Sequence, residues 1–156
     1  SAGTIYAWGC NDDSALGHDG NGYTPQLVTE LSSRVNGITA GDCHSMAYNT
    51  ETSEAFIWGL YKNSVDGSVL FPKDKLPRQF GQELFSQGPK NRLVKLTSGG
   101  HHSLALTADG TIYGFGDAEC GKIGMIAEKD TNRSDEPMKL DNVGAKNAVD
   151  IFASKH

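Results

Sequence analysis

The sequence predicts an all-β fold, a β-propeller of four-stranded antiparallel blades, of which this chain carries about three. Glycine accounts for 19 of the 156 residues, and glycine weakens helix interiors. The repeated segments are rich in isoleucine, tyrosine, tryptophan and threonine, which favour strands. Strand-rich segments that recur about every 50 residues are typical of propeller blades. We therefore interpret residues 1–156 as one partial propeller.

One recurring segment is a short strand that places an aromatic side chain directly before a glycine. It ends at Gly9, Gly59 and Gly116, at intervals of 50 and 57 residues. Because the aromatic residues recur with the strand, we expect them to pack between neighbouring blades. These residues are Trp8, Trp58 and Phe115.

A second signature, with glycine shortly before histidine, falls between the copies of the first. Residues 40–45 recur as residues 98–103, and weakly as residues 153–156. The histidines at the shared position are His44, His102 and His156. A histidine that recurs with the repeat favours a hydrogen bond that stabilises each blade over a role in catalysis.

Each unit offers four strands in order. The expected strands span residues 35–40, 44–49, 54–58 and 76–80 in one unit, and 93–98, 102–107, 111–115 and 136–140 in the next. Pro25, Pro77 and Pro137 mark the fourth strand, which must be an edge strand because proline cannot donate to the ladder. Residues 81–91 read as an inserted loop. The repeat units are roughly 3–53, 54–109 and 110–156, the last truncated.

The strands of this chain are too few to close a propeller ring. The chain begins at the third strand of one blade and stops at the first strand of another, whereas closed propellers have about four to eight blades. We therefore expect missing blades or other chains to complete the ring. On its own the chain should be unstable or self-associate, because its sheet flanks remain open.

Composition and spacing argue against several classes of partner. The formal net charge is −5, so direct binding to nucleic acid is unfavoured, and no apolar run is long enough to cross a membrane. Three cysteines without a C-x-x-C pair fit a reducing intracellular compartment. No histidine or cysteine spacing predicts a metal site.

Residues 116–123 nearly match a phosphate-binding loop, but the repeat explains them better. Ile123 stands where a magnesium-binding Ser or Thr is needed, and no helix follows to receive the phosphate. The same glycine spacing follows Gly9. No G-x-S-x-G elbow is present either. We therefore expect no cofactor, no catalytic residues and no bond chemistry.

Residues 9–17, 40–44 and 106–110 together resemble the second to fourth blades of the regulator of chromosome condensation family. The resemblance covers nearly the whole chain and implies a seven-bladed propeller with one face that docks a Ran-type small GTPase. It further implies a guanine-nucleotide exchange factor, located in the nucleus, that regulates nucleocytoplasmic transport and chromosome condensation. The alternative is a non-catalytic propeller that serves as an interaction scaffold or regulatory module.

The turn after Gly59 contains three more residues than the turns after Gly9 and Gly116. A lengthened turn on a rigid blade is a natural probe into a partner, and the resemblance places it where the family inserts a wedge beside the bound nucleotide. The wedge residues are Tyr61, Lys62, Asn63, Ser64, Val65 and Asp66. The alternative is a tolerated surface insertion, since long loops cost little entropy.

Two further positions are candidates for GTPase binding. Asp42 has Gly100 as its counterpart in the next unit, so the repeat does not require it; it is either a docking acid or a turn residue. His101 stands where the resemblance implies an acid important for exchange.

The resemblance gives little support for binding to histones or the nucleosome. Met125 replaces a basic residue of the family that contacts the GTPase. The long arginine-bearing loop of the family is shortened to residues 126–137, with the single arginine Arg133.

Overall fold

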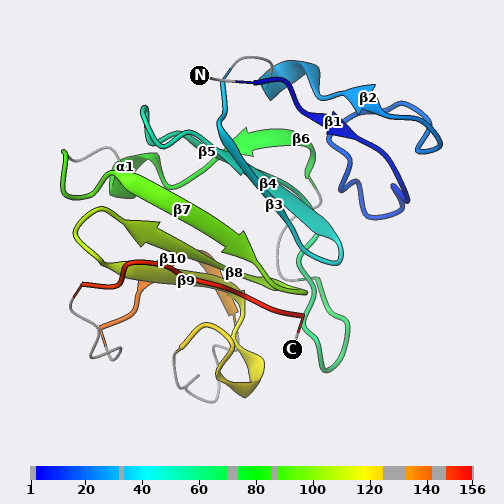
Figure 1. Ribbon diagram of the computed structural model, residues 1–156. Helices are drawn as coiled ribbons and strands as arrows, with labels where there is room; N and C mark the ends of the chain where they lie inside the picture. The colour runs from blue at the N-terminus through cyan, green and yellow to red at the C-terminus, as the bar shows by residue number, and fades with distance from the viewer. Residues whose placement is uncertain are drawn as a thin grey trace.

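The computed structural model describes residues 3–31, 34–69, 74–85, 88–124, 133–141 and 147–155 (Figure 1). These residues form three antiparallel sheets, which confirms the all-β propeller architecture. Within this part of the chain, no helix combines the length and the apolar character that a membrane span requires.

The strands follow one another as meanders. The first sheet pairs β1 (Tyr6–Ala7) with β2 (Gln26–Leu27). The second has the order β3 (Gly37–Ala40), β4 (His44–Tyr48), β5 (Ala55–Gly59) and β6 (Asp74–Gln79). The third contains β7 (Leu93–Ser98), β8 (His102–Thr107), β9 (Ile112–Asp117) and β10 (Arg133–Lys139), again in sequence order. Two 3₁₀ turns are η1 (Thr29–Leu31) and η2 (Glu119–Gly121).

The expected fourth strands lie at sheet edges. Pro77 is in β6 and Pro137 is in β10, each the last strand of its sheet. The pairing of both strands shifts register, between Ile57 and Gly59 and between Ser134 and Met138. A missing N–H donor is tolerated at such an irregular edge. Residues 81–91 differ from the expected plain loop, because they contain α1 (Gln82–Phe85).

Apolar side chains from successive sheets pack against each other. Phe85, at the end of α1, is 1% exposed, so burial of its ring accounts for the helical turn in this segment. The cluster between the second and third sheets comprises Met46, Ala55, Ile57, Tyr61, Phe85, Leu93, Leu96, Ala105, Tyr113 and Phe115. A second cluster, which includes Ile5, Val28, Phe56 and Trp58, joins the first sheet to the second.

The prediction for the three aromatic residues is correct for two of them. Trp58 and Phe115 are 3% and 1% exposed, whereas Trp8 is 61% exposed. The Trp58 indole Nε1–H donates to the carbonyl oxygen of Ala15, in the preceding unit, over 2.8 Å. In the described chain no preceding unit packs against Trp8. The prediction that it packs between blades is therefore wrong for this residue.

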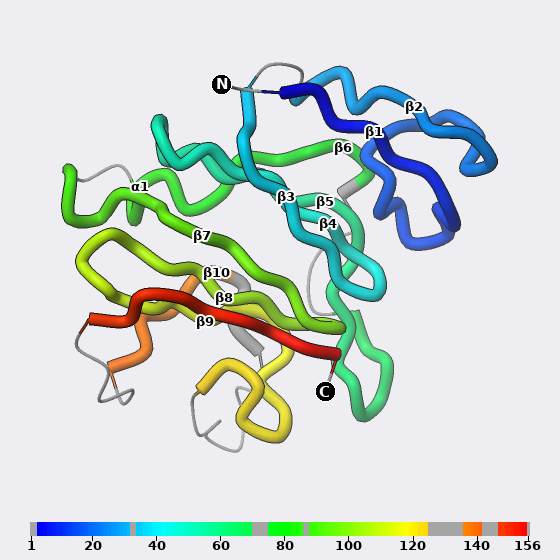
Figure 2. Tube along the Cα trace, in the orientation of Figure 1, coloured from blue at the N-terminus to red at the C-terminus, as the bar shows by residue number. Residues whose placement is uncertain are grey.

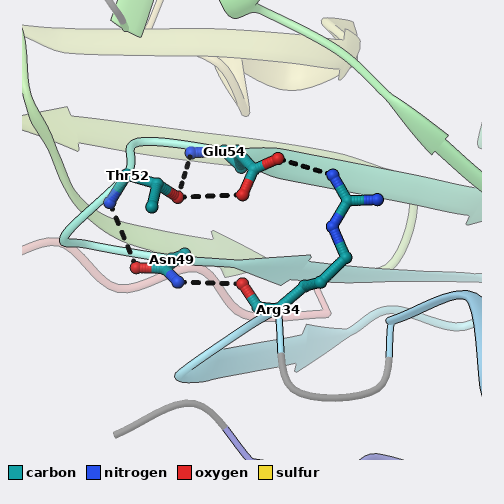
Figure 3. Close-up of polar contacts among 4 residues, drawn as sticks. All are labelled: Arg34, Asn49, Thr52 and Glu54. Atoms are coloured by element: carbon teal, nitrogen blue, oxygen red, sulfur yellow. Dashed lines mark hydrogen bonds and ion pairs between the residues drawn. The ribbon is translucent and has the colours of Figure 1, made fainter.

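The turn between β4 and β5, at the end of the blade opposite to residues 41–43, is fixed by its own polar side chains (Figure 3). Asn49 donates through Nδ2 to the carbonyl of Arg34 over 2.8 Å, and its Oδ1 accepts from the Thr52 N–H. The Arg34 guanidinium reaches Glu54 Oε1 at 2.6 Å. These contacts hold the hairpin in register.

Residues 147–155 run beside β7 (Figure 2). The Ala153 N–H donates to Thr97 Oγ1, just as the Ser98 N–H donates to Thr39 Oγ1 between the second and third sheets. Ile151 is buried. This segment therefore lies where the innermost strand of a following blade belongs.

Candidate functional site

The turns between the first and second strands of each blade lie at one end of the sheets. The turns that follow each third strand lie at the same end. Polar contacts between the turns show the arrangement: the Asp42 N–H donates to the carbonyl of Gly100 over 3.0 Å, and the Lys62 ammonium lies 3.0 Å from Asp13 Oδ2. We call this end the turn face and define it by residues 9–17, 41–43, 60–69, 99–101 and 117–124.

The lengthened turn forms a β-hairpin over residues 62–69. Lys62 pairs with Val69, and the Asn63 N–H donates to the carbonyl of Ser68 over 2.8 Å. The Asn63 side-chain Oδ1 accepts from the Val65 N–H over 2.7 Å. Gly67 closes the turn at φ 70°, a value that glycine adopts without steric cost.

The tip of the hairpin faces solvent, as the sequence predicts for most of it. Ser64, Val65 and Asp66 are exposed, Val65 to 74%. Figure 1 shows the hairpin extending beyond the ends of the strands in the second and third sheets. An apolar side chain held at such a tip can enter a partner.

Tyr61 contradicts the prediction that it belongs to the exposed wedge. It is 2% exposed, stacks on His44 with ring centroids 3.8 Å apart, and shares a 2.8 Å hydrogen bond with Ser103. A Cβ on Gly116 would lie 2.9 Å from the Tyr61 ring. Glycine at 116 therefore makes room for this ring, and Tyr61 belongs to the core beneath the hairpin.

The base of the hairpin is tied to the first unit through Lys62. Its ammonium also lies 3.7 Å from Cys43 Sγ. Burial raises the pKa of the Cys43 thiol to about 11, with a further contribution from Asp13. Cys43 is therefore a protonated thiol and not a nucleophile.

Asp42 presents its carboxylate on the turn face. The side chain is 39% exposed, and Oδ2 lies 3.4 Å from the Lys155 ammonium, which is itself 66% exposed. The Asp42 backbone N–H holds the turn, so the carboxylate can exchange its exposed Lys155 partner for a cation of another protein without disturbing the turn.

His101 lies among charges of both signs. Burial lowers its pKa below the ordinary value, and Lys62 and Lys122 act in the same direction, while Asp42 and Asp117 oppose them. The imidazole is therefore neutral at neutral pH. His101 thus brings no negative charge to the place where the resemblance implies an acid.

The recurrent histidines have structural roles where they are described. His44 is fully buried, and its Nε2 shares a 3.3 Å hydrogen bond with Ser103 of the next blade. Burial lowers the pKa of His44 to about 3, so it stays neutral. His102 is 4% exposed and packs over Gly99, while His156 lies outside the described residues.

Sequence reasoning misses three charged residues of the turn face, namely Asp13, Asp117 and Lys122. Asp117 and Lys122 could have been found by comparing units, because the uncharged residues Cys10 and Ala15 take their places in the first unit.

Among the described residues, no three histidine, cysteine or acidic side chains are placed to hold a metal ion. Met125 and most of residues 126–137 lie outside the described chain.

Comparison with known proteins identifies the repeats. Residues 2–48 and residues 93–122 each match a family model described as the regulator of chromosome condensation (RCC1) repeat. The human protein named Regulator of chromosome condensation is 35% identical over 139 residues, which cover 85% of this chain and 31% of that protein. The chain therefore spans about a third of the length of this relative.

Other similar proteins differ in name and in length. Human E3 ubiquitin-protein ligase HERC2 is 28% identical over 147 residues, 91% of this chain but only 3% of that protein. The crystal structure of Prp20p from Saccharomyces cerevisiae, described with its binding to Gsp1p and histones, superposes with a TM-score of 0.79 at 23% identity. It covers 96% of this chain and 36% of Prp20p. Human WBSCR16 superposes with a TM-score of 0.74 at 19% identity, over 99% and 38% of the two chains.

Proposed function

We propose, because residues 2–48 and 93–122 match models of the regulator of chromosome condensation repeat, that this chain forms part of a guanine-nucleotide exchange factor for a Ran-type small GTPase. The turn face docks the GTPase, and the hairpin 62–69 is the element that displaces the nucleotide. The observation that carries the proposal is this hairpin, anchored at its base and exposed at its tip.

Exchange of this kind needs no bond chemistry. The factor binds the nucleotide-free GTPase more tightly than the loaded form, and by linkage it weakens nucleotide binding by the same factor. A thousandfold effect corresponds to about 4 kcal/mol. The Val65 tip can occupy space beside the nucleotide, while the Asp42 carboxylate competes for the lysine and backbone amides that hold its phosphates.

The relatives support the class of partner. Prp20p is described with binding to Gsp1p and to histones, and the human relative is a regulator of chromosome condensation. By this likeness we propose a nuclear location. Histone binding is the weaker part of the proposal, because the shortened segment after Ile123 contains one arginine.

A second candidate function is that of a regulatory or interaction module beside another domain. HERC2 supports it, since a segment similar to this chain makes up 3% of that ligase. The two candidates differ in what they require of the hairpin, because a scaffold does not depend on a wedge that enters a GTPase.

The direct test is release of a fluorescent guanine nucleotide from a Ran-type GTPase, with and without catalytic amounts of the intact protein. We expect release to accelerate by about a thousandfold, in line with the coupling above. Release at the intrinsic rate would favour the scaffold function.

Asp42→Ala should weaken GTPase binding without destabilising the blade. The ion pair with Lys155 is exposed and contributes little, so the free energy of unfolding should change by no more than about 0.5 kcal/mol. Binding to nucleotide-free GTPase should weaken by about 2 kcal/mol if the carboxylate pairs with a desolvated cation. Lys155→Met is the matched control; an equal loss of binding in that variant would show that Asp42 acts only through Lys155.

His101→Asp should raise the exchange rate and flatten its dependence on pH. Because burial lowers the pKa of His101, the native side chain gains charge only below about pH 6.5, the ordinary histidine value. A protonated imidazole would repel the lysine that holds the phosphates, so native exchange should fall below that pH. Rates measured from pH 5.5 to 8 check this. If His101→Asp changes neither rate nor profile while Asp42→Ala abolishes exchange, Asp42 supplies the acid.

A further inference from the structure

A buried ion pair of the third sheet reaches across to the hairpin 62–69. The Lys122 ammonium lies 2.6 Å from Asp117 Oδ2, and these side chains are 13% and 0% exposed. The same ammonium donates to the Ser64 hydroxyl of the hairpin. Lys122 thus links Asp117 of its own blade to Ser64 of the hairpin.

The repeat does not require this pair. Counted from Gly9 and Gly116, the first unit has Cys10 where the third has Asp117, and Ala15 where the third has Lys122. A turn of this type therefore forms without either charge. Burying two charges costs desolvation that their attraction only partly repays. Asp117 also accepts a hydrogen bond from the Glu119 N–H within its own turn, so it is the presence of Lys122 that points to a role outside the blade.

The opposite side of the hairpin is held in a similar way. Lys62 at its base pairs with Asp13 of the first unit at 3.0 Å. The hairpin, which rises from the second sheet, is therefore bracketed by one lysine–aspartate pair toward each neighbour. An isolated two-stranded hairpin is only marginally stable in water, so its direction depends on these attachments.

We propose that Lys122, oriented by Asp117, is a positioning residue that fixes the direction of the hairpin 62–69 through Ser64. Its effect on nucleotide exchange rests on the function proposed above. A wedge that is already ordered loses less conformational entropy when it enters the GTPase. Loss of Lys122 should therefore reduce exchange even though Lys122 need not touch the GTPase.

The test replaces the pair by the residues that the first unit uses. The double variant Asp117→Cys with Lys122→Ala leaves no unpaired buried charge, and both residues are accepted at these places in the first unit. In the intact protein, deuterium uptake at residues 62–69, followed by mass spectrometry, should become about tenfold faster. Uptake over β8 should stay unchanged, and exchange on the GTPase should fall about tenfold.

Three variants make the assignment specific. Ser64→Ala should reproduce both effects, and combining it with the double variant should add nothing, because all three side chains belong to one contact. Lys122→Arg keeps the charge and should retain slow uptake. Lys139→Met removes a lysine that pairs with Asp141 at the surface and should change neither measurement.

Unchanged deuterium uptake at residues 62–69 in the double variant and in Ser64→Ala would overturn the positioning role. Additive effects of the two changes would also overturn it, since Lys122 would then not act through Ser64. Faster uptake together with a native protein that does not accelerate nucleotide release would support the positioning role and contradict the exchange function, so the two claims fail separately.

Discussion

Replacing residues 63–68 by a two-residue Asn-Gly turn should reduce nucleotide exchange on a Ran-type GTPase by on the order of a hundredfold, or about 2.7 kcal/mol. The shortened hairpin keeps Lys62 and its ion pair with Asp13, and Asn-Gly suits a tight hairpin turn. It removes the exposed tip around Val65. Exchange rates with a fluorescent guanine nucleotide provide the measurement.

The folded protein should tolerate this deletion, because the removed tip contacts little of the core. The free energy of unfolding should change by no more than about 0.5 kcal/mol. Thr52→Ala is the control, since Thr52 lies in the turn at the other end of the blade (Figure 3) and should not affect exchange. If the shortened protein exchanges nucleotide at the native rate, the hairpin is a tolerated insertion.

Tyr61→Ala should lower the free energy of unfolding by about 3–5 kcal/mol, the usual cost of removing a large buried aromatic side chain. The ring is 2% exposed and packs on His44 and against Gly116, so its loss opens a cavity between two blades. Urea unfolding of the intact protein, compared at a common slope, gives the difference.

Tyr61→Phe is the matched control for this change. It keeps the ring and removes only the hydroxyl bonded to Ser103 at 2.8 Å, so it should cost about 1 kcal/mol. Burial raises the pKa of Tyr61 well above its ordinary value, so neither variant should alter the pH dependence of stability near neutrality. Equal, small effects of the two substitutions would mean that the ring does not belong to the core.

The strands could be predicted because local signals mark both of their ends. β7 and β8 match the expected ranges to the residue, since Gly99, Gly100 and Gly110 close the turns around them. Proline alone predicts that the fourth strand lies at an edge, because proline has no N–H to donate to a neighbouring strand.

The position of the inserted residues within the turn could not be predicted from the spacing of the repeat. Counted from Gly59 with three extra residues, Val69 takes the place of Leu16 and Ile123. Leu16 and Ile123 are 6% and 2% exposed, but Val69 is 54% exposed. The extra residues enter after Tyr61 instead, and Tyr61 fills the space against Gly116. A spacing pattern counts inserted residues but does not say which of them keep their contacts with the core.

Contacts between blades could not be predicted from the sequence of single units. Ser64 and Lys122 meet although 58 positions separate them, and Trp8 repeats the pattern of Trp58 without its neighbour. Such contacts depend on which blades stand side by side, which the repeat does not encode.

The affinity of the intact protein for a Ran-type GTPase, measured with and without bound nucleotide, tests the central claim most directly. The account predicts that the nucleotide-free form binds about a thousandfold more tightly than the GDP-loaded form, since that preference equals the weakening of nucleotide binding. Added GTP or GDP should then dissociate the complex. Equal affinity for the two forms would contradict the account, because a partner that does not distinguish them cannot accelerate exchange.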